Sequence, residues 1–306
     1  MSDYLLDRIQ LKSKLSFWRN IAILAIACVV IYFTIASRND NSANTTLQNP
    51  YIARITINGE INEDFEREQI LSKLANNDKV QAVILRIDSP GGTAFGGESL
   101  YHSLRKIAEK KPLIAVIGTM ATSGGYMASL AADHVVARSS SLTGSIGAMM
   151  LTGEISDLAK KIGLNFILFQ SGDLKAEPMF THPLTDKAKK STTTLINSTA
   201  DMFASMVMER RKLTKEQVGR FTDGRVLTGQ QAFEGKLIDD IGGEDEAVAW
   251  LESNKQIVKT TPIKDVDLKD DDQIFKKFTS PFDKMNETFS SITNLVKSLQ
   301  SHMVVK

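Results

Sequence analysis

The chain has 306 residues, of which 42% are hydrophobic and 24% are charged, a composition typical of a globular protein with one large domain or two modest ones. The formal net charge of +1 excludes a globally basic surface, so no nucleic-acid partner is expected. Cys28 is the single cysteine, which excludes an intrachain disulfide.

The N-terminal region predicts a membrane anchor. Residues 20–37 carry no charged side chain and are almost entirely apolar, about the length needed to cross a bilayer core. The preceding residues 1–19 hold four basic side chains, so we expect this N-terminus in the cytoplasm and the rest of the chain outside it. A cleaved signal peptide and a buried core helix are the alternatives for residues 20–37.

A polar linker at residues 38–50 is followed by short apolar runs that alternate with amphipathic stretches. This alternation predicts an α/β domain over residues 51–260, with a largely parallel sheet and flanking helices. The first helix is expected to place Phe65, Ile70, Leu71 and Leu74 on one side. Strands are predicted at 51–57, 82–87, 113–117, 134–137 and 165–169, and helices at 64–76, 97–110, 124–132 and 185–212.

The composition changes after residue 260. Residues 261–306 are predicted to form a charged linker and an amphipathic tail, whose apolar residues recur at alternating steps of three and four. Three interpretations fit this pattern: a helix packed on its own domain or on a neighbouring subunit, a helix lying on a membrane surface, and a coiled coil.

Ser123 lies where the predicted strand at 113–117 leads, through a loop of small residues, into the predicted helix at 124–132. The dipole and free N–H groups of a helix N-terminus favour developing negative charge. A serine at this position can be a nucleophile, or it can simply be the N-cap of an ordinary helix. The segment alone fits both interpretations.

Loops after other predicted strands hold groups that a serine nucleophile needs. The turn at Gly91 and Gly92 can present N–H groups to an oxyanion, although a glycine-rich turn is often only a turn. The loop after residue 170 contains two candidate bases, Lys175 and His182, and a lysine can act as a base only when it is neutral. Ser145, which lies between two glycines, can contact a neutral lysine amine.

The other three histidines are weaker candidates for the base. His102 falls within a predicted helix, and His302 falls in the C-terminal tail. His134 begins a short strand and is expected to have a structural role.

Five segments in the same order resemble the signal peptide peptidase A family of membrane-anchored bacterial serine peptidases. The resemblance covers roughly residues 50–250, and its motifs are "IDSPGG", "ATSGGYMASLAAD", "LTGSIGAM", "SGDLKAEP" and "DGRVLTGQQAFEGKLIDDIGG". It implies the fold of the crotonase and Clp-protease superfamily and a Ser/Lys dyad that needs no cofactor and no metal. The implied roles are nucleophile for Ser123, general base for Lys175, orientation of the base for Ser145, and oxyanion hole for Gly91, Gly92 and Gly124.

The same resemblance implies where the protein works and with what. A single copy of the domain is similar to the short form of the family, which assembles into a ring or dome in which neighbouring subunits share each dyad. The expected substrates are cleaved signal peptides and other apolar peptides at the bacterial plasma membrane, with the catalytic domain on the extracytoplasmic side. Three alternatives remain: a peptidase with His182 as base, an acyl-CoA enzyme of the crotonase type, and a non-catalytic membrane scaffold.

Overall fold

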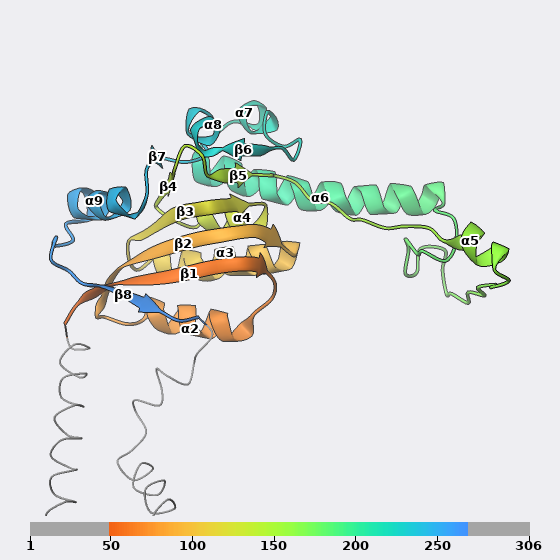
Figure 1. Ribbon diagram of the computed structural model, residues 1–306, viewed down its shortest axis with the longest axis horizontal. Coiled ribbons are helices and arrows are strands. Elements are labelled where there is room, and N and C mark those ends of the chain that lie inside the picture. Colours follow the sequence, from red (N-terminus) through yellow and green to blue (C-terminus); the bar gives the residue numbers. More distant parts are fainter. Residues whose placement is uncertain (1–48, 269–306) are drawn as a thin grey trace, which may run out of the picture. The chain divides into compact units, whose positions relative to one another are not determined.

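The computed structural model describes residues 49–268, which centre on an eight-stranded sheet (Figure 1). The strand order is β6-β5-β3-β2-β1-β8, and β4 pairs with both β3 and β7. Within the described residues every strand pair is parallel except β5 with β6, so the sheet is mixed. The strands are β1 (Tyr51–Ile61), β2 (Val80–Gly92), β3 (Leu113–Thr122), β4 (His134–Ala137), β5 (Leu142–Gly144), β6 (Val226–Thr228), β7 (Asp240–Ile241) and β8 (Ile263–Val266).

Helices cover both faces of the sheet, because its central strands are apolar on both sides. On β2, Leu85 belongs to the larger core with the apolar faces of α2, α3, α4 and the C-terminal half of α6, whereas the adjacent Ile84 belongs to a smaller core with α9. The helices are α2 (Phe65–Ala75), α3 (Ala94–Ala108), α4 (Gly124–Ser129), α5 (Ser156–Lys161), α6 (Asp186–Arg211), α7 (Lys215–Gly219), α8 (Gly229–Glu234) and α9 (Glu244–Lys255).

The predicted α/β class and most predicted elements between residues 51 and 212 are confirmed. The strand predicted at 113–117 continues as β3 to Thr122, so it ends directly before Ser123. On the first helix, Ile70, Leu71 and Leu74 are buried as expected. The prediction for Phe65 is wrong: it is the first residue of α2 and is 70% exposed.

The predicted strand at 165–169 is wrong. All five residues are exposed and have no strand partner, and Phe169 is 92% exposed. Aromatic and β-branched side chains favour a strand, but a strand also needs a neighbour that accepts its backbone hydrogen bonds. The described part of the chain supplies no such neighbour here.

The structure also contains strands that the apolar patterns did not predict. Residues 263–266 fall in the predicted charged linker, yet they form β8 and pair in parallel with β1. β5 and β6 have three residues each and make the antiparallel pair beside β3. Strands this short and this polar carry little periodicity, so their pairing depends on the neighbouring β1 and β3.

The predicted cytoplasmic N-terminus at 1–19, the anchor at 20–37 and nearly all of the amphipathic tail lie outside the described residues. For residues 49–268, no helix combines the length and the apolar character that crossing a membrane requires.

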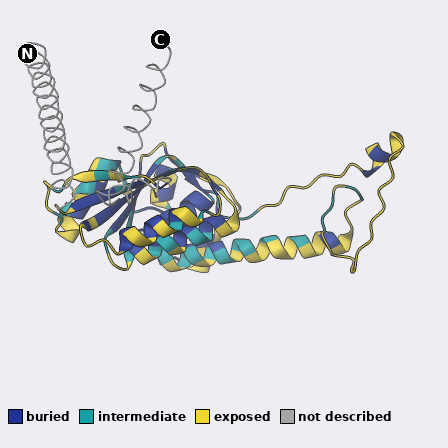
Figure 2. Cartoon of the chain, turned by 90° about the horizontal axis from the view of Figure 1, so that it is seen from below, coloured by how far each residue is buried: buried dark blue, intermediate teal, exposed yellow. Residues whose placement is uncertain are grey.

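A long arm, defined here as residues 148–200, extends from the domain (Figures 1 and 2). It comprises an extended segment, α5, a loop and the N-terminal half of α6, and most of its residues are exposed. The hydrogen bonds of its loops join residues of the arm to each other, as from the Ile155 N–H to the Phe180 carbonyl (2.9 Å) and from Lys187 to Asp173 (2.9 Å).

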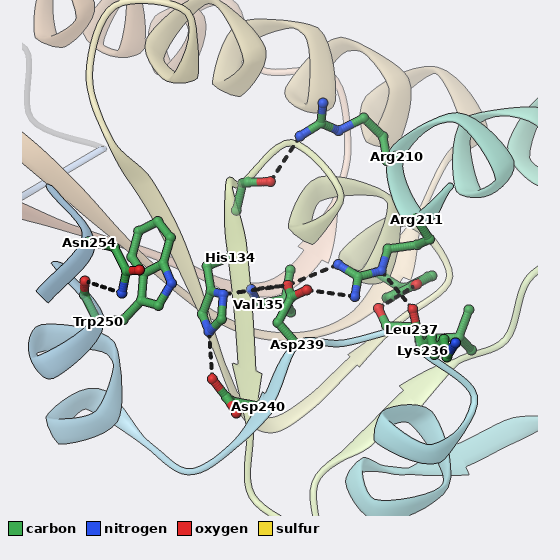
Figure 3. A network of polar contacts seen from close by, with 12 residues as sticks. His134, Val135, Arg210, Arg211, Lys236, Leu237, Asp239, Asp240, Trp250 and Asn254 are labelled. Atoms are coloured by element: carbon green, nitrogen blue, oxygen red, sulfur yellow. Dashed lines mark hydrogen bonds and ion pairs between the residues drawn. The ribbon is translucent and has the colours of Figure 1, made fainter. Parts of the chain in front are cut away.

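The C-terminal end of α6 is fixed to the domain by a network of polar contacts (Figure 3). Arg211 donates hydrogen bonds of 2.8 and 2.9 Å to the two carboxylate oxygens of Asp239, which also accepts the N–H of Val135 on β4 (2.8 Å). Burial alone would raise the pKa of Asp239, but the Arg211 guanidinium and the Val135 N–H hold that pKa below its usual range.

Replacing Asp239 with alanine should therefore lower the free energy of unfolding by about 1–3 kcal/mol, because it leaves the partly buried Arg211 guanidinium without its carboxylate partner. A carboxyl with a lowered pKa stabilises the fold above its unfolded pKa and loses this effect as the pH falls through the folded value. Denaturant unfolding should thus show the difference from wild type at neutral pH and a shrinking difference below about pH 4. Asp223→Asn, which breaks an exposed Asp–Arg pair, is the matched control and should change stability much less.

Candidate active site

Ser123 lies at the junction of β3 and α4 with an unusual backbone conformation, φ 52° and ψ −121°. Positive φ is uncommon for a residue other than glycine, and such conformations cluster at functional sites. Its N–H donates to the carbonyl of Gly144 on β5 (2.9 Å), which fixes the turn. Ser123 is the N-cap residue of α4 by position, but its side chain makes no capping hydrogen bond. The hydroxyl is therefore not committed to the helix.

Glycines allow the end of β2 to lie directly against this turn. A methyl group on Gly91, whose φ is +103°, would lie 2.8 Å from the Cβ of Ser123 and 2.9 Å from the amide nitrogen of Gly124. A methyl group on Gly125 would lie 2.9 Å from the carbonyl oxygen of Ser89. The prediction of a turn at Gly91 and Gly92 is wrong, because both residues belong to β2 and pair with β1. This end of β2 is in contact with the predicted nucleophile, and the space between them has no room for a side chain.

The amide groups at the end of β2 and the start of α4 differ in their availability to an oxyanion. The Gly91 N–H donates to the buried hydroxyl of Ser89 (3.1 Å). The Thr93 N–H donates to the carbonyl of Ile61 on β1 (3.0 Å), and successive N–H groups of an extended segment point to opposite sides, so the Gly92 N–H points away from β1.

The Gly92 N–H therefore faces α4, and its nitrogen would lie 3.5 Å from a methyl group on Gly124. Gly124 is the first residue of α4, where an N–H has no intrahelical acceptor. Of the three predicted donors, Gly92 and Gly124 lie next to each other at the N-terminus of α4. The third donor, the Gly91 N–H, is bound by Ser89, a residue that was not predicted to be part of the site.

Gly144, whose carbonyl accepts the Ser123 N–H, is the residue before Ser145, so the structure brings the two serines close together. Ser145 also has a positive φ of 52°, and its N–H donates to the carbonyl of Arg225 (2.9 Å). The predicted contact of Ser145 with the base stays a prediction.

Lys175 lies in the arm, on the loop between α5 and α6, and its side chain is exposed. The β3–α4 junction lies at the other end of the arm from this loop (Figure 1). Two cavities of the described chain, of about 390 and 500 Å³, are lined by residues other than Ser123 and Lys175. A single chain therefore does not bring the predicted base to the predicted nucleophile.

The histidines are placed by other contacts. His134 donates a hydrogen bond from Nε2 to the carboxylate of Asp240 (2.9 Å) and stacks on the ring of Trp250, with the ring centroids 4.7 Å apart (Figure 3). This confirms its expected structural role. His102 is exposed on α3, and His302 lies outside the described residues.

His182 lies on the same loop as Lys175. Its Nε2 is 2.6 Å from a carboxylate oxygen of Glu177, and its Nδ1 is 3.4 Å from the hydroxyl of Thr181. Both ring nitrogens are thus engaged within the loop. Glu177 was not predicted as a site residue, although it belongs to the "SGDLKAEP" segment.

Comparisons with known proteins identify the family of the chain. The model of peptidase family S49 matches residues 105–258, and the Clp protease model matches residues 38–163. A Synechocystis sp. chain assigned as a protease is 34% identical, with 65% of this chain and 72% of that protein covered. Protease 4 of Haemophilus influenzae is 36% identical, and the match covers 64% of this chain and 32% of Protease 4. An Enterococcus faecium chain assigned as signal peptide peptidase SppA is 29% identical, and the match covers 70% of this chain and 67% of that protein.

The match to the Clp protease model agrees with the parallel core of the sheet and its flanking helices. The S49 match spans Ser123, Ser145 and Lys175, the side chains on which the expected chemistry depends. The chain therefore belongs to peptidase family S49, the family of signal peptide peptidase A, and is a serine peptidase.

Proposed function

We propose that the protein is an endopeptidase that digests cleaved signal peptides and other apolar peptides, with Ser123 as nucleophile and Lys175 as general base. The observation that carries this proposal is the strained turn at Ser123. Its hydroxyl is free of capping, and the Gly92 and Gly124 amides lie beside it. A hydroxyl and two N–H groups held together in this way form the apparatus that acyl transfer to serine requires.

The reaction would proceed in two steps. Neutral Lys175 takes the proton of the Ser123 hydroxyl while Oγ attacks the peptide carbonyl carbon, and the Gly92 and Gly124 N–H groups stabilise the oxyanion. The C–N bond then breaks, and the lysine ammonium gives its proton to the leaving amine. Water loses a proton to the same lysine, attacks the acyl carbon and releases the acid, and the proton returns to Ser123. Ser145 would orient the amine of Lys175.

We further propose that Lys175 acts on Ser123 of a neighbouring subunit in a ring or dome. Two features of the arm support this: its base-bearing loop is remote from Ser123 of its own chain, and it exposes many apolar side chains. An exposed apolar area of this kind is typical of a surface that another protein covers. A neighbour that covered this loop would also remove Lys175 from water, which favours the neutral amine.

The location proposed for this assembly is the bacterial plasma membrane, with the peptidase domain on the extracytoplasmic side. The support is the uncharged stretch at residues 20–37 behind a basic N-terminus. Apolar peptides released into a bilayer would be available to an enzyme held there. This location also disfavours an acyl-CoA enzyme, because CoA is a cytoplasmic cofactor.

Cleavage of an apolar signal-peptide segment should become faster as the pH rises from about 6 to about 10, because a base must lose its own proton before it accepts another. Steady-state rates across this range measure the effect, with a polar peptide of equal length as the poorer substrate. The His182→Gln variant should keep this pH dependence, since its amide can still donate to Glu177 but cannot act as a base. A flat profile would contradict a lysine base, and loss of activity in His182→Gln would favour His182 instead.

A further inference from the structure

Glu177 and His182 are hydrogen-bonded to each other inside the loop that carries Lys175. The carboxylate of Glu177 accepts a hydrogen bond from His182 Nε2 (2.6 Å) and a second from the N–H of Met179 (3.2 Å). Its side chain is only 5% exposed, although the loop around it is largely open to solvent. A carboxylate is buried at a cost unless hydrogen bonds satisfy it, so these contacts point to a specific role for the pair.

The turn that presents Lys175 ends at Glu177. The Lys175 N–H donates to the carbonyl of Gly172 (2.9 Å), and the Glu177 N–H lies 3.4 Å from the carbonyl of Leu174. Between them Ala176 has a φ of 66°, a left-handed conformation that is uncommon for a residue other than glycine. The backbone of Lys175 is thus held by a turn whose C-terminal end is fixed through the side chain of Glu177.

The pair also connects this turn to the start of α6. Three residues after His182, the hydroxyl of Thr185 accepts the N–H of Ala188 and caps the helix (3.1 Å). Because His182 precedes this cap, its bond to Glu177 ties the turn of Lys175 to the end of a long helix. A second tie, the ion pair of Asp173 with Lys187 (2.9 Å), is exposed at both ends and is expected to hold the loop less firmly.

We infer that Glu177 and His182 are positioning residues for Lys175: their hydrogen bond fixes the loop so that the amine is presented in one place. This inference rests on the proposed role of Lys175 as the general base. The hydrogen bond leaves Nε2 of His182 facing Glu177, so His182 contributes to catalysis through the loop and not by proton transfer.

The test compares Glu177→Ala and His182→Ala with the conservative Glu177→Gln and His182→Gln, which retain hydrogen-bonding groups at the same places. The alanine variants should lower kcat by about 10- to 100-fold with KM nearly unchanged, since a small misplacement of a catalytic group has an effect of this size. The conservative variants should recover most of this loss. Asp173→Asn is the matched control in the same loop and should stay within about threefold of wild type.

Two further measurements separate the possible failures. Thermal unfolding and size-exclusion chromatography show whether each variant is folded and assembled as the wild type is. Lys175→Ala tests the function on which the inference rests: if it retains activity, the proposed base is wrong. If Lys175→Ala is inactive while the folded Glu177→Ala and His182→Ala variants keep wild-type kcat, only the positioning role is overturned. Equal losses in the alanine and glutamine variants would overturn it as well.

Discussion

Ser123→Ala should reduce peptide hydrolysis by about 10⁴-fold or more, because removal of the nucleophile of a serine peptidase leaves only the contributions of the oxyanion hole and binding. The same change should abolish covalent labelling by a fluorophosphonate probe. Rates and labelling are measured on one preparation, and unfolding is followed to show that the variant is folded.

The control for this experiment is Ser140→Ala, which changes an exposed serine on the loop before β5 and should leave both readouts unchanged. The outcome also separates an enzyme from a scaffold. If the wild type is folded and assembled but is neither labelled nor active, the non-catalytic interpretation is correct. Labelling that persists in Ser123→Ala would place the nucleophile elsewhere.

Mixing Ser123→Ala chains with Lys175→Ala chains should restore activity that neither variant has alone. If each site takes its serine from one subunit and its lysine from a neighbour, an equimolar random assembly should have about a quarter of its sites intact. The variants are dissociated together, reassembled and assayed at fixed total concentration. This expectation follows from the placement of Lys175 on the arm, away from Ser123 of its own chain.

A mixture of Lys175→Ala with the double variant is the matched control, because no chain in it supplies the lysine. It should stay inactive while it assembles to the same extent. If the Ser123→Ala and Lys175→Ala chains co-assemble and no activity returns, both residues act within one protomer. The arm would then have to fold back on its own domain during catalysis.

Most of the domain could be predicted from the sequence, because its central strands are continuous apolar runs between amphipathic helices. The position of Ser123 at a strand-to-helix junction was predicted for the same reason. Its positive φ was not, since it results from the hydrogen bond to Gly144 and the contact with Gly91, which are remote in sequence. The engagement of the Gly91 N–H by Ser89 depends equally on the folded structure.

The failed prediction at residues 165–169 has a different cause. The segment has the composition of a strand, but composition does not say where the neighbouring strand comes from. β8 is the opposite case: its sequence is partly charged, and it forms because β1 offers an open edge. In both places the deciding factor is a partner that the local sequence does not encode.

The separation of the Lys175 loop from Ser123 affects the activity of the chain before it assembles. With a dyad shared between subunits, a newly made chain would be inactive until it assembled with others. Its activity would depend on the local concentration of subunits, so dilution would inactivate it and accumulation in one region would activate it. The projecting arm would in this way make activity depend on the number of assembled subunits and not on an inhibitor.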